Sequence, residues 1–157
     1  MKFSAQEEYG LRCLIALART GEDGSLTIPE ISKMEGMTAS HVAKILAILR
    51  KAKFVKSTRG QLGGYSLATS PDRIVVRDVL VPLGGKIFDN EFCDKHTGVL
   101  DTCVHDTDCI LRPLWGSIQT AVDSVVGKYT LADLMEGRVE SPKLGLTQPP
   151  TRVPVRS

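Results

Sequence analysis

Three of the four cysteines of this 157-residue chain lie within one short acidic stretch, at Cys93, Cys103 and Cys109. Thiolates are ligands of zinc and of iron–sulfur clusters, and cysteines gathered in one loop can converge on such a centre without regular structure. The surrounding carboxylates favour a bound cation over a bare, activated thiolate nucleophile. The stretch therefore predicts a metal or iron–sulfur site to which one ligand still has to be assigned.

The residue types near the cysteines leave the fourth ligand open. A histidine nitrogen can complete a thiolate site, and His105 lies between Cys103 and Cys109, whereas His96 follows Cys93. The remaining cysteine, Cys13, falls within an apolar helical stripe, where a buried structural thiol is the expected role. We therefore expect Cys13 to take no part in the site.

Basic residues form a second constellation upstream, with six Lys and Arg residues and no acid between positions 43 and 60. Polar side chains at the start of a recognition helix reach base edges, and cations at its end and in a following hairpin bind phosphates. Glycines in such a hairpin let the backbone approach a duplex closely, and Arg59 could enter the minor groove. The predicted DNA contacts are Thr38, Ser40, His41, Lys44, Arg50, Lys51, Arg59, Gln61, Gly63, Gly64 and Tyr65.

Short helices and a hairpin must position these side chains. An apolar stripe predicts a first helix over about residues 4–18. Capping-box spacing at Thr27 opens a helix over 28–35 that Gly36 ends, and Thr38 or Ser40 caps the next helix. Strand candidates at 54–58 and 65–68 flank a glycine-rich loop. This order indicates a winged helix-turn-helix, so the predicted fold class is mainly α with a small β-hairpin wing.

The second half of the chain supplies the remaining segments. Residues 74–83 indicate the start of a strand and a short helix, which completes a DNA-binding domain at 1–85; the cysteine loop follows at 86–109. Residues 110–140 contain a long amphipathic helix, over about 110–128, and a short one, and 141–157, with four prolines and no acid, indicate a disordered tail. Because the long helix has little core left to cover, we expect a homodimer, which also suits a pseudo-palindromic operator in double-stranded DNA.

Charge is distributed unevenly along the chain although its formal net value is only +2. Residues 1–70 carry ten Lys and Arg against six Asp and Glu, whereas residues 71–140 carry seven against twelve. Localised basic charge is typical of a nucleic-acid footprint. We find no signal peptide and no apolar run of membrane-spanning length, so we expect a cytoplasmic chain with no membrane partner. The absence of Cys-x-x-Cys, His-Glu-x-x-His and phosphate-binding glycine motifs argues against an enzyme.

Residues 1–137 resemble the Rrf2 family of bacterial winged-helix transcription regulators. Four segments carry the resemblance: Met1–Ser4 with Glu8–Arg12, the helix-turn-helix residues 38–52, the wing residues Arg59-Gly60 and Gly63-Gly64-Tyr65, and Tyr129–Leu134 after the long helix. The wing is the most specific of these matches. The resemblance implies a winged helix-turn-helix protein that dimerises through the helix following the cysteines.

The resemblance also implies a cofactor, because in the iron–sulfur-binding branch of the family three cysteines precede the dimerisation helix. Some members add a histidine three residues after the last cysteine, a position that Arg112 occupies here. Others are similar to this chain in having a carboxylate on the first helix, contributed across the dimer, and Glu8 falls there. The resemblance thus implies a 4Fe–4S or 2Fe–2S cluster with Glu8 as fourth ligand, ahead of His105 and Glu7.

The implied function is a DNA-binding regulator, a repressor, whose DNA affinity responds through the cluster to redox state, nitric oxide or iron. One alternative keeps DNA binding but replaces the cluster with zinc or a thiol–disulfide switch. A second alternative is a small metal- or thiol-dependent enzyme, which would leave the basic helix and the wing unexplained.

Overall fold

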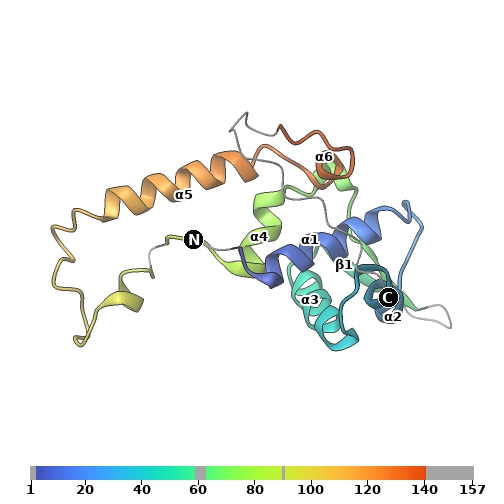
Figure 1. Ribbon diagram of the computed structural model, residues 1–157, viewed down its shortest axis with the longest axis horizontal. Helices are drawn as coiled ribbons and strands as arrows, with labels where there is room; N and C mark the ends of the chain where they lie inside the picture. The colour runs from blue at the N-terminus through green and yellow to red at the C-terminus, as the bar shows by residue number, and fades with distance from the viewer. Residues whose placement is uncertain (1–2, 59–62, 90, 141–157) are drawn as a thin grey trace, which may run out of the picture.

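The computed structural model describes residues 3–58, 63–89 and 91–140. The predicted DNA contacts Arg59 and Gln61 and the predicted tail at 141–157 lie outside the described residues. The described chain is mainly helical with one antiparallel hairpin, as the sequence predicts. Figure 1 shows a helical body from which one long helix extends to the side.

Three helices form the first part of the body, and local capping sets where each begins. Helix α1 (Ala5–Ala18) and helix α2 (Ile28–Glu35) each start with a complete capping box, from Ser4 and Thr27 respectively. Helix α2 ends at Gly36, whose φ of 66° lies in the left-handed region that glycine adopts without strain. Thr38 caps the start of helix α3 (Ala39–Lys51), so of the two predicted caps Thr38 is the one used.

The hairpin that follows α3 is the wing. Strand β1 (Val55–Thr58) pairs antiparallel with strand β2 (Gly64–Leu67); β1 starts one residue later than predicted, and β2 lies one residue earlier than its predicted range. Tyr65 also pairs with Leu26, so the loop between α1 and α2 lies along the hairpin. A Cβ atom at Gly64 would lie 2.8 Å from the carbonyl oxygen of Leu26, which is why glycine is required at this close approach.

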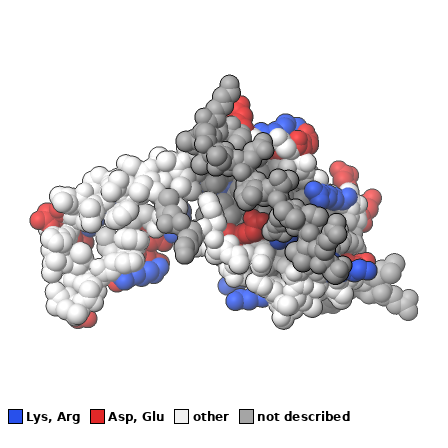
Figure 2. Space-filling model, viewed as in Figure 1, with Lys and Arg blue, Asp and Glu red and all other residues white. Residues whose placement is uncertain are grey.

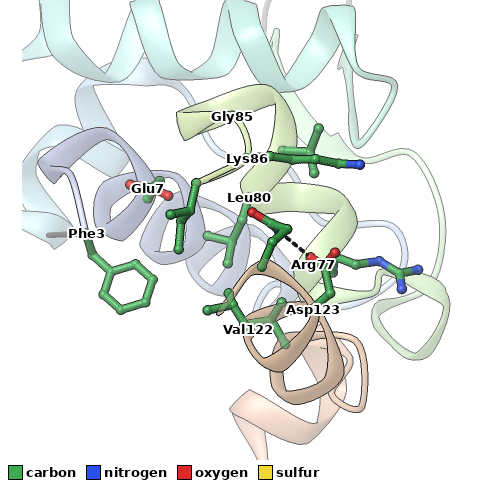
Figure 3. A pocket seen from close by; sticks show the side chains of 12 residues that line it. Phe3, Glu7, Arg77, Leu80, Gly85, Lys86, Val122 and Asp123 are labelled. Carbon is green, nitrogen blue, oxygen red and sulfur yellow. Dashed lines mark hydrogen bonds between the residues drawn. The ribbon is translucent and has the colours of Figure 1, made fainter. Parts of the chain in front are cut away.

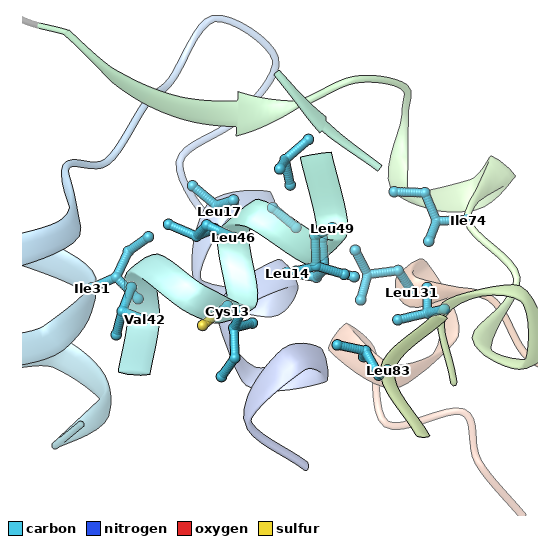
Figure 4. Close-up of a cluster of buried hydrophobic side chains, with 14 of the residues drawn as sticks. Cys13, Leu14, Leu17, Ile31, Val42, Leu46, Leu49, Ile74, Leu83 and Leu131 are labelled. Atoms are coloured by element: carbon cyan, nitrogen blue, oxygen red, sulfur yellow. The ribbon is translucent and has the colours of Figure 1, made fainter. Parts of the chain in front are cut away.

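The hydrophobic core lies between α1, α3 and the elements that follow the wing (Figure 4). Helix α4 (Val76–Gly84) and helix α6 (Leu131–Met135) close it, and a short 3-10 turn, η1 (Pro71–Arg73), precedes α4. The strand start predicted at residue 74 is a single bridge between Val75 and Thr130. The fully buried large side chains include Leu14, Leu17, Ile31, Ile45, Leu46, Leu49, Ile74 and Leu131. Leu131 therefore anchors the end of the described chain in the same core as α1.

Helix α5 (Arg112–Val126) is the long helix that extends from the body, shorter by two residues at each end than predicted. None of its residues is buried, although its sequence is strongly amphipathic. The cysteine-bearing segment, with one 3-10 turn η2 (Asp94–His96), lies at the far end of α5 from the body (Figure 1). Among the helices described, none is both long and apolar enough to cross a membrane.

Candidate functional site

The recognition helix α3 divides its residues cleanly between core and solvent. Val42, Ile45, Leu46 and Leu49 are fully buried, whereas Thr38, Ser40 and Lys44 are exposed near the helix start. The Thr38 hydroxyl accepts a hydrogen bond from the backbone N–H of His41 at 3.3 Å, and it lies 3.2 Å from the Ser40 hydroxyl. The polar residues predicted to read bases therefore lie together at one helix end.

His41, a predicted DNA contact, also makes a packing contact that the sequence did not indicate. Its ring is half-buried and packs edge-to-face on Tyr9 of α1, with 5.2 Å between ring centroids. Arg12 lies over the same Tyr9 ring and its Nε donates to Glu35 at the end of α2 at 2.8 Å. These contacts attach α1 directly to both helices of the helix-turn-helix.

The wing and the end of α3 carry the remaining predicted DNA contacts. Arg50, Lys51 and Lys56 are exposed, and Gly63, Gly64 and Tyr65 are half-buried. The Thr58 hydroxyl donates to the carbonyl of Gly64 and accepts from its N–H, both at 3.1 Å, which closes the base of the hairpin loop. The described part of this surface thus has a polar start of α3, and exposed cations at the end of α3 and on β1.

The three clustered cysteines all carry free, partly exposed thiols, whereas Cys13 is fully buried. Burial raises the pKa of Cys13 to about 12, so it stays protonated at neutral pH. Over the described residues, no three Cys, His, Asp or Glu side chains are gathered closely enough in one chain to hold a metal ion. The donors suited to a soft metal are therefore present but not converged within a single subunit.

Arg112, the first residue of α5, is the side chain that connects the two parts of the cysteine loop. Its Nη2 lies 3.9 Å from the Cys93 sulfur and donates to the carbonyl of Asp106 at 2.8 Å. The hydrogen bond to Cys93, with the charges of Cys93, Asp106 and Cys109, raises the pKa of Arg112. His105, predicted as a possible ligand, instead lies 3.6 Å from the Asp108 carboxylate.

An aromatic cluster holds the first part of the cysteine loop on α5. Phe92 stacks on His96 with centroids 4.1 Å apart, and it also contacts Phe88 and Trp115. Gln119 of α5 accepts a hydrogen bond from the Phe88 N–H at 3.0 Å. Sequence reasoning missed this cluster, although Phe88, Phe92 and His96 recur every four residues.

Glu7 and Glu8 lie at the opposite end of α5 from the cysteines of the same chain. Glu7 completes the Ser4 capping box and lines a cavity of about 260 Å³ with Val122 and Asp123 of α5 (Figure 3). Glu8, its neighbour, is exposed. Eleven residues separate Arg112 from Asp123, which is roughly 16 Å along a helix. Glu8 therefore lies far from Cys93 of its own chain.

A winged helix-turn-helix with an exposed polar recognition helix is the fold and site of a DNA-binding regulator. Over residues 3–137 the chain matches the profile of the Rrf2 family, described as "Iron-dependent Transcriptional regulator". The chain belongs to this family of transcriptional regulators, which are not enzymes. Winged-helix regulators of the family bind DNA and generally form dimers.

Individual relatives agree with this assignment. The chain is 32% identical over 143 residues to the protein rrf2 of Nitratidesulfovibrio vulgaris, which covers 91% of this chain and 93% of the relative. The structure of CymR, the global cysteine regulator of B. subtilis, has a TM-score of 0.69 and 32% identity, covering 87% of this chain and 98% of CymR. The structure of T. potens IscR has a TM-score of 0.68 and 26% identity, and the match covers 95% of this chain and 94% of the IscR chain.

Proposed function

We propose that this chain is a homodimeric transcriptional repressor whose affinity for a pseudo-palindromic operator is controlled by an iron–sulfur cluster. The observation that carries the proposal is the position of three free, partly exposed thiols at the outer end of α5. Cys93, Cys103 and Cys109 would hold the cluster, 4Fe–4S or 2Fe–2S, and soft thiolates suit that group. When bound, the cluster would supply a centre that reacts with oxidants and nitric oxide and that links the residues binding it.

The exposed stripe of α5 supports dimerisation. Leu114, Ile118, Ala121 and Val125 recur at helical spacing, and Leu114 and Val125 are 51% and 55% exposed. The face of α5 visible in Figure 2 carries almost no charged side chains. An apolar helix face of this length is stabilised when a second copy covers it. An antiparallel pair of α5 helices would bury both stripes about a two-fold axis.

The same antiparallel packing provides the fourth ligand. Residues 119–126 of α5 lie beside the start of α1, while the cysteines lie at the other end of α5. Antiparallel pairing of two α5 helices would bring α1 of the partner toward the cysteines of this chain. Glu8 of α1 is exposed and is the proposed ligand across the dimer, whereas Glu7 is engaged in capping and His105 faces Asp108.

Control of DNA binding follows from the contacts of α1. Tyr9, next to Glu8, packs on His41 of the recognition helix, and Arg12 is paired with Glu35. A change in the tie between Glu8 and the partner's cysteine loop would therefore shift the two recognition helices relative to each other. Thr38, Ser40 and Lys44, with the wing cations, would then lose register on the two half-sites.

The first prediction tests the ligand set by anaerobic purification with iron, sulfide and zinc analysis. We expect the unmodified chain to contain iron and sulfide, and Cys93→Ala and Glu8→Gln to lower both, because each removes a ligand. Cys13→Ala and Glu7→Gln are the matched controls and should keep the cluster. A colourless protein without iron or sulfide would contradict the proposal.

The alternative is regulation of DNA binding by zinc or by a thiol–disulfide switch. It is favoured by one observation, that the three thiols are free and not converged in one described subunit. Zinc without sulfide would support the first form, and a reversible disulfide without metal the second.

A further inference from the structure

Among the described residues, Arg112 is a cation in polar contact with one of the clustered cysteines. The segment from 86 to 112 carries six acids, and its other cations are Lys86 and Lys95. Lys95 is paired with Glu91 at 2.8 Å, and Lys86 lines the cavity near the body of the molecule. Arg112 alone of the three has a polar contact with a cysteine sulfur.

The position of Arg112 runs against the usual preferences of helices. A helix N-terminus carries partial positive charge, so its first turn favours acids and disfavours cations. The first turn of α5 contains no acid and begins with Arg112. A local rule broken in this way is expected where function compensates for the cost. Here the compensation comes from the cysteine loop, through the Cys93 sulfur and the carbonyl of Asp106.

We propose that Arg112 is a positioning residue for the cysteine loop, holding Cys93 near the Cys103–Cys109 segment and offsetting the negative charge of the bound cluster. The charge-offsetting role rests on the proposed function, whereas the positioning role does not. The guanidinium has several donors in a fixed fork, so it can contact a sulfur and a carbonyl at once. A histidine at this position could bind the metal directly. Arg112 cannot act as a ligand, and it leaves a positive charge beside the sulfurs instead.

Packing of the residue before Cys93 adds a second restraint on this part of the loop. Phe92, the preceding residue, lies in the aromatic cluster with His96 and Trp115. Cys93 is thus held near α5 by two sets of contacts, the ring packing of its neighbour Phe92 and the polar contact with Arg112. Trp115 is the only tryptophan of the chain, so its fluorescence reports on this contact.

Removing the cation has a defined consequence for a bound cluster. Reduction adds negative charge, so a nearby cation and a hydrogen bond to sulfur both favour the reduced form. Arg112→Gln should therefore make the reduction potential of the cluster more negative. It should also speed loss of the cluster in air, roughly tenfold, as the loss of an outer-shell partner does for metal sites.

The experiment compares Arg112→Gln and Arg112→Lys with Lys95→Gln, which removes a cation of the same loop without touching a cysteine. In the cluster-free protein, Arg112→Gln should change Trp115 emission and speed proteolysis between residues 97 and 108, and Lys95→Gln should not. In the anaerobic loaded protein, potential and cluster loss should shift in Arg112→Gln. Arg112→Lys keeps the charge, so its potential should stay nearer that of the unmodified chain.

The outcomes separate the two proposals. An unmodified chain without iron and sulfide overturns the proposed function and the charge-offsetting role, and the cluster-free readouts then decide the positioning role. A loaded chain whose Arg112→Gln variant matches Lys95→Gln in fluorescence, proteolysis, potential and cluster loss overturns this inference while the proposed function stands.

Discussion

At the scale of single residues, cysteines with the same thiol group differ in their burial and in their contacts. Cys13 packs among the fully buried side chains of the core, and desolvation raises its pKa to about 12. Cys93 is partly exposed and faces the guanidinium of Arg112 at the start of α5. A buried neutral thiol is a poor ligand, since metals bind the thiolate. Cys13 therefore serves packing, and the three partly exposed cysteines are the ones proposed as ligands.

The DNA footprint gives a second prediction at the residue scale. Lys44→Ala and Arg59→Ala should weaken binding to operator DNA and lower the slope of log affinity against log salt by roughly one each, because each cation releases about one counterion. Cluster content should stay unchanged. The measurement is fluorescence anisotropy with labelled duplex over a salt series. Lys128→Ala, an exposed cation after α5, is the control. Equal binding by the parent and both variants would show that the footprint lies elsewhere.

At the scale of elements, capping fixes where three helices begin. The pairs Ser4 with Glu7, Thr27 with Glu30, and Thr130 with Asp133 each form both hydrogen bonds of a capping box. Such pairs are encoded by residues three positions apart, so the start of α2 at Ile28 could be predicted from sequence alone. The ends of α5 were predicted less well because its boundaries depend on loop contacts, including those of Arg112.

Capping also predicts how stability depends on pH. Backbone and side-chain hydrogen bonds from Thr27 lower the pKa of Glu30 below that of the unfolded chain. Its stabilising effect is therefore present above the unfolded pKa and is lost as the pH falls through the folded one. Urea unfolding gives the free energy of unfolding at pH 7 and at pH 3. The loss of this free energy between pH 7 and pH 3 should be smaller for Glu30→Gln than for the parent. Glu22→Gln, in the α1–α2 connection, should behave like the parent.

At the scale of the whole molecule, one helix carries the cysteines away from the DNA-binding body. Figure 1 shows α5 extending from α4, with the cysteine loop at its outer end. An exposed apolar helix of this kind is unstable in isolation and gains stability from a partner. The proposed dimer would bury the stripe of α5 and bring Glu8 of each subunit to the cysteines of the other.

The dimer gives the last prediction. Leu114→Glu should convert the protein to a monomer, because burying an unpaired carboxylate in the apolar interface would cost much free energy. Sedimentation velocity measures the change, and circular dichroism should show retained helix. The exposed Met34 of α2 supplies the control, Met34→Glu, which should stay dimeric. A dimeric Leu114→Glu protein would exclude this face as the interface.

The sequence by itself determined the order of elements, the recognition helix, the wing and the family, because caps, glycines and apolar periodicity act over a few residues. The tertiary structure decided the rest. It separated the start of α1, which carries Glu8, from the cysteine loop of the same chain, set Arg112 on Cys93 and packed His41 against Tyr9. The two contacts join residues 19 and 32 positions apart, and such pairings depend on how helices pack in space, which local spacing does not encode.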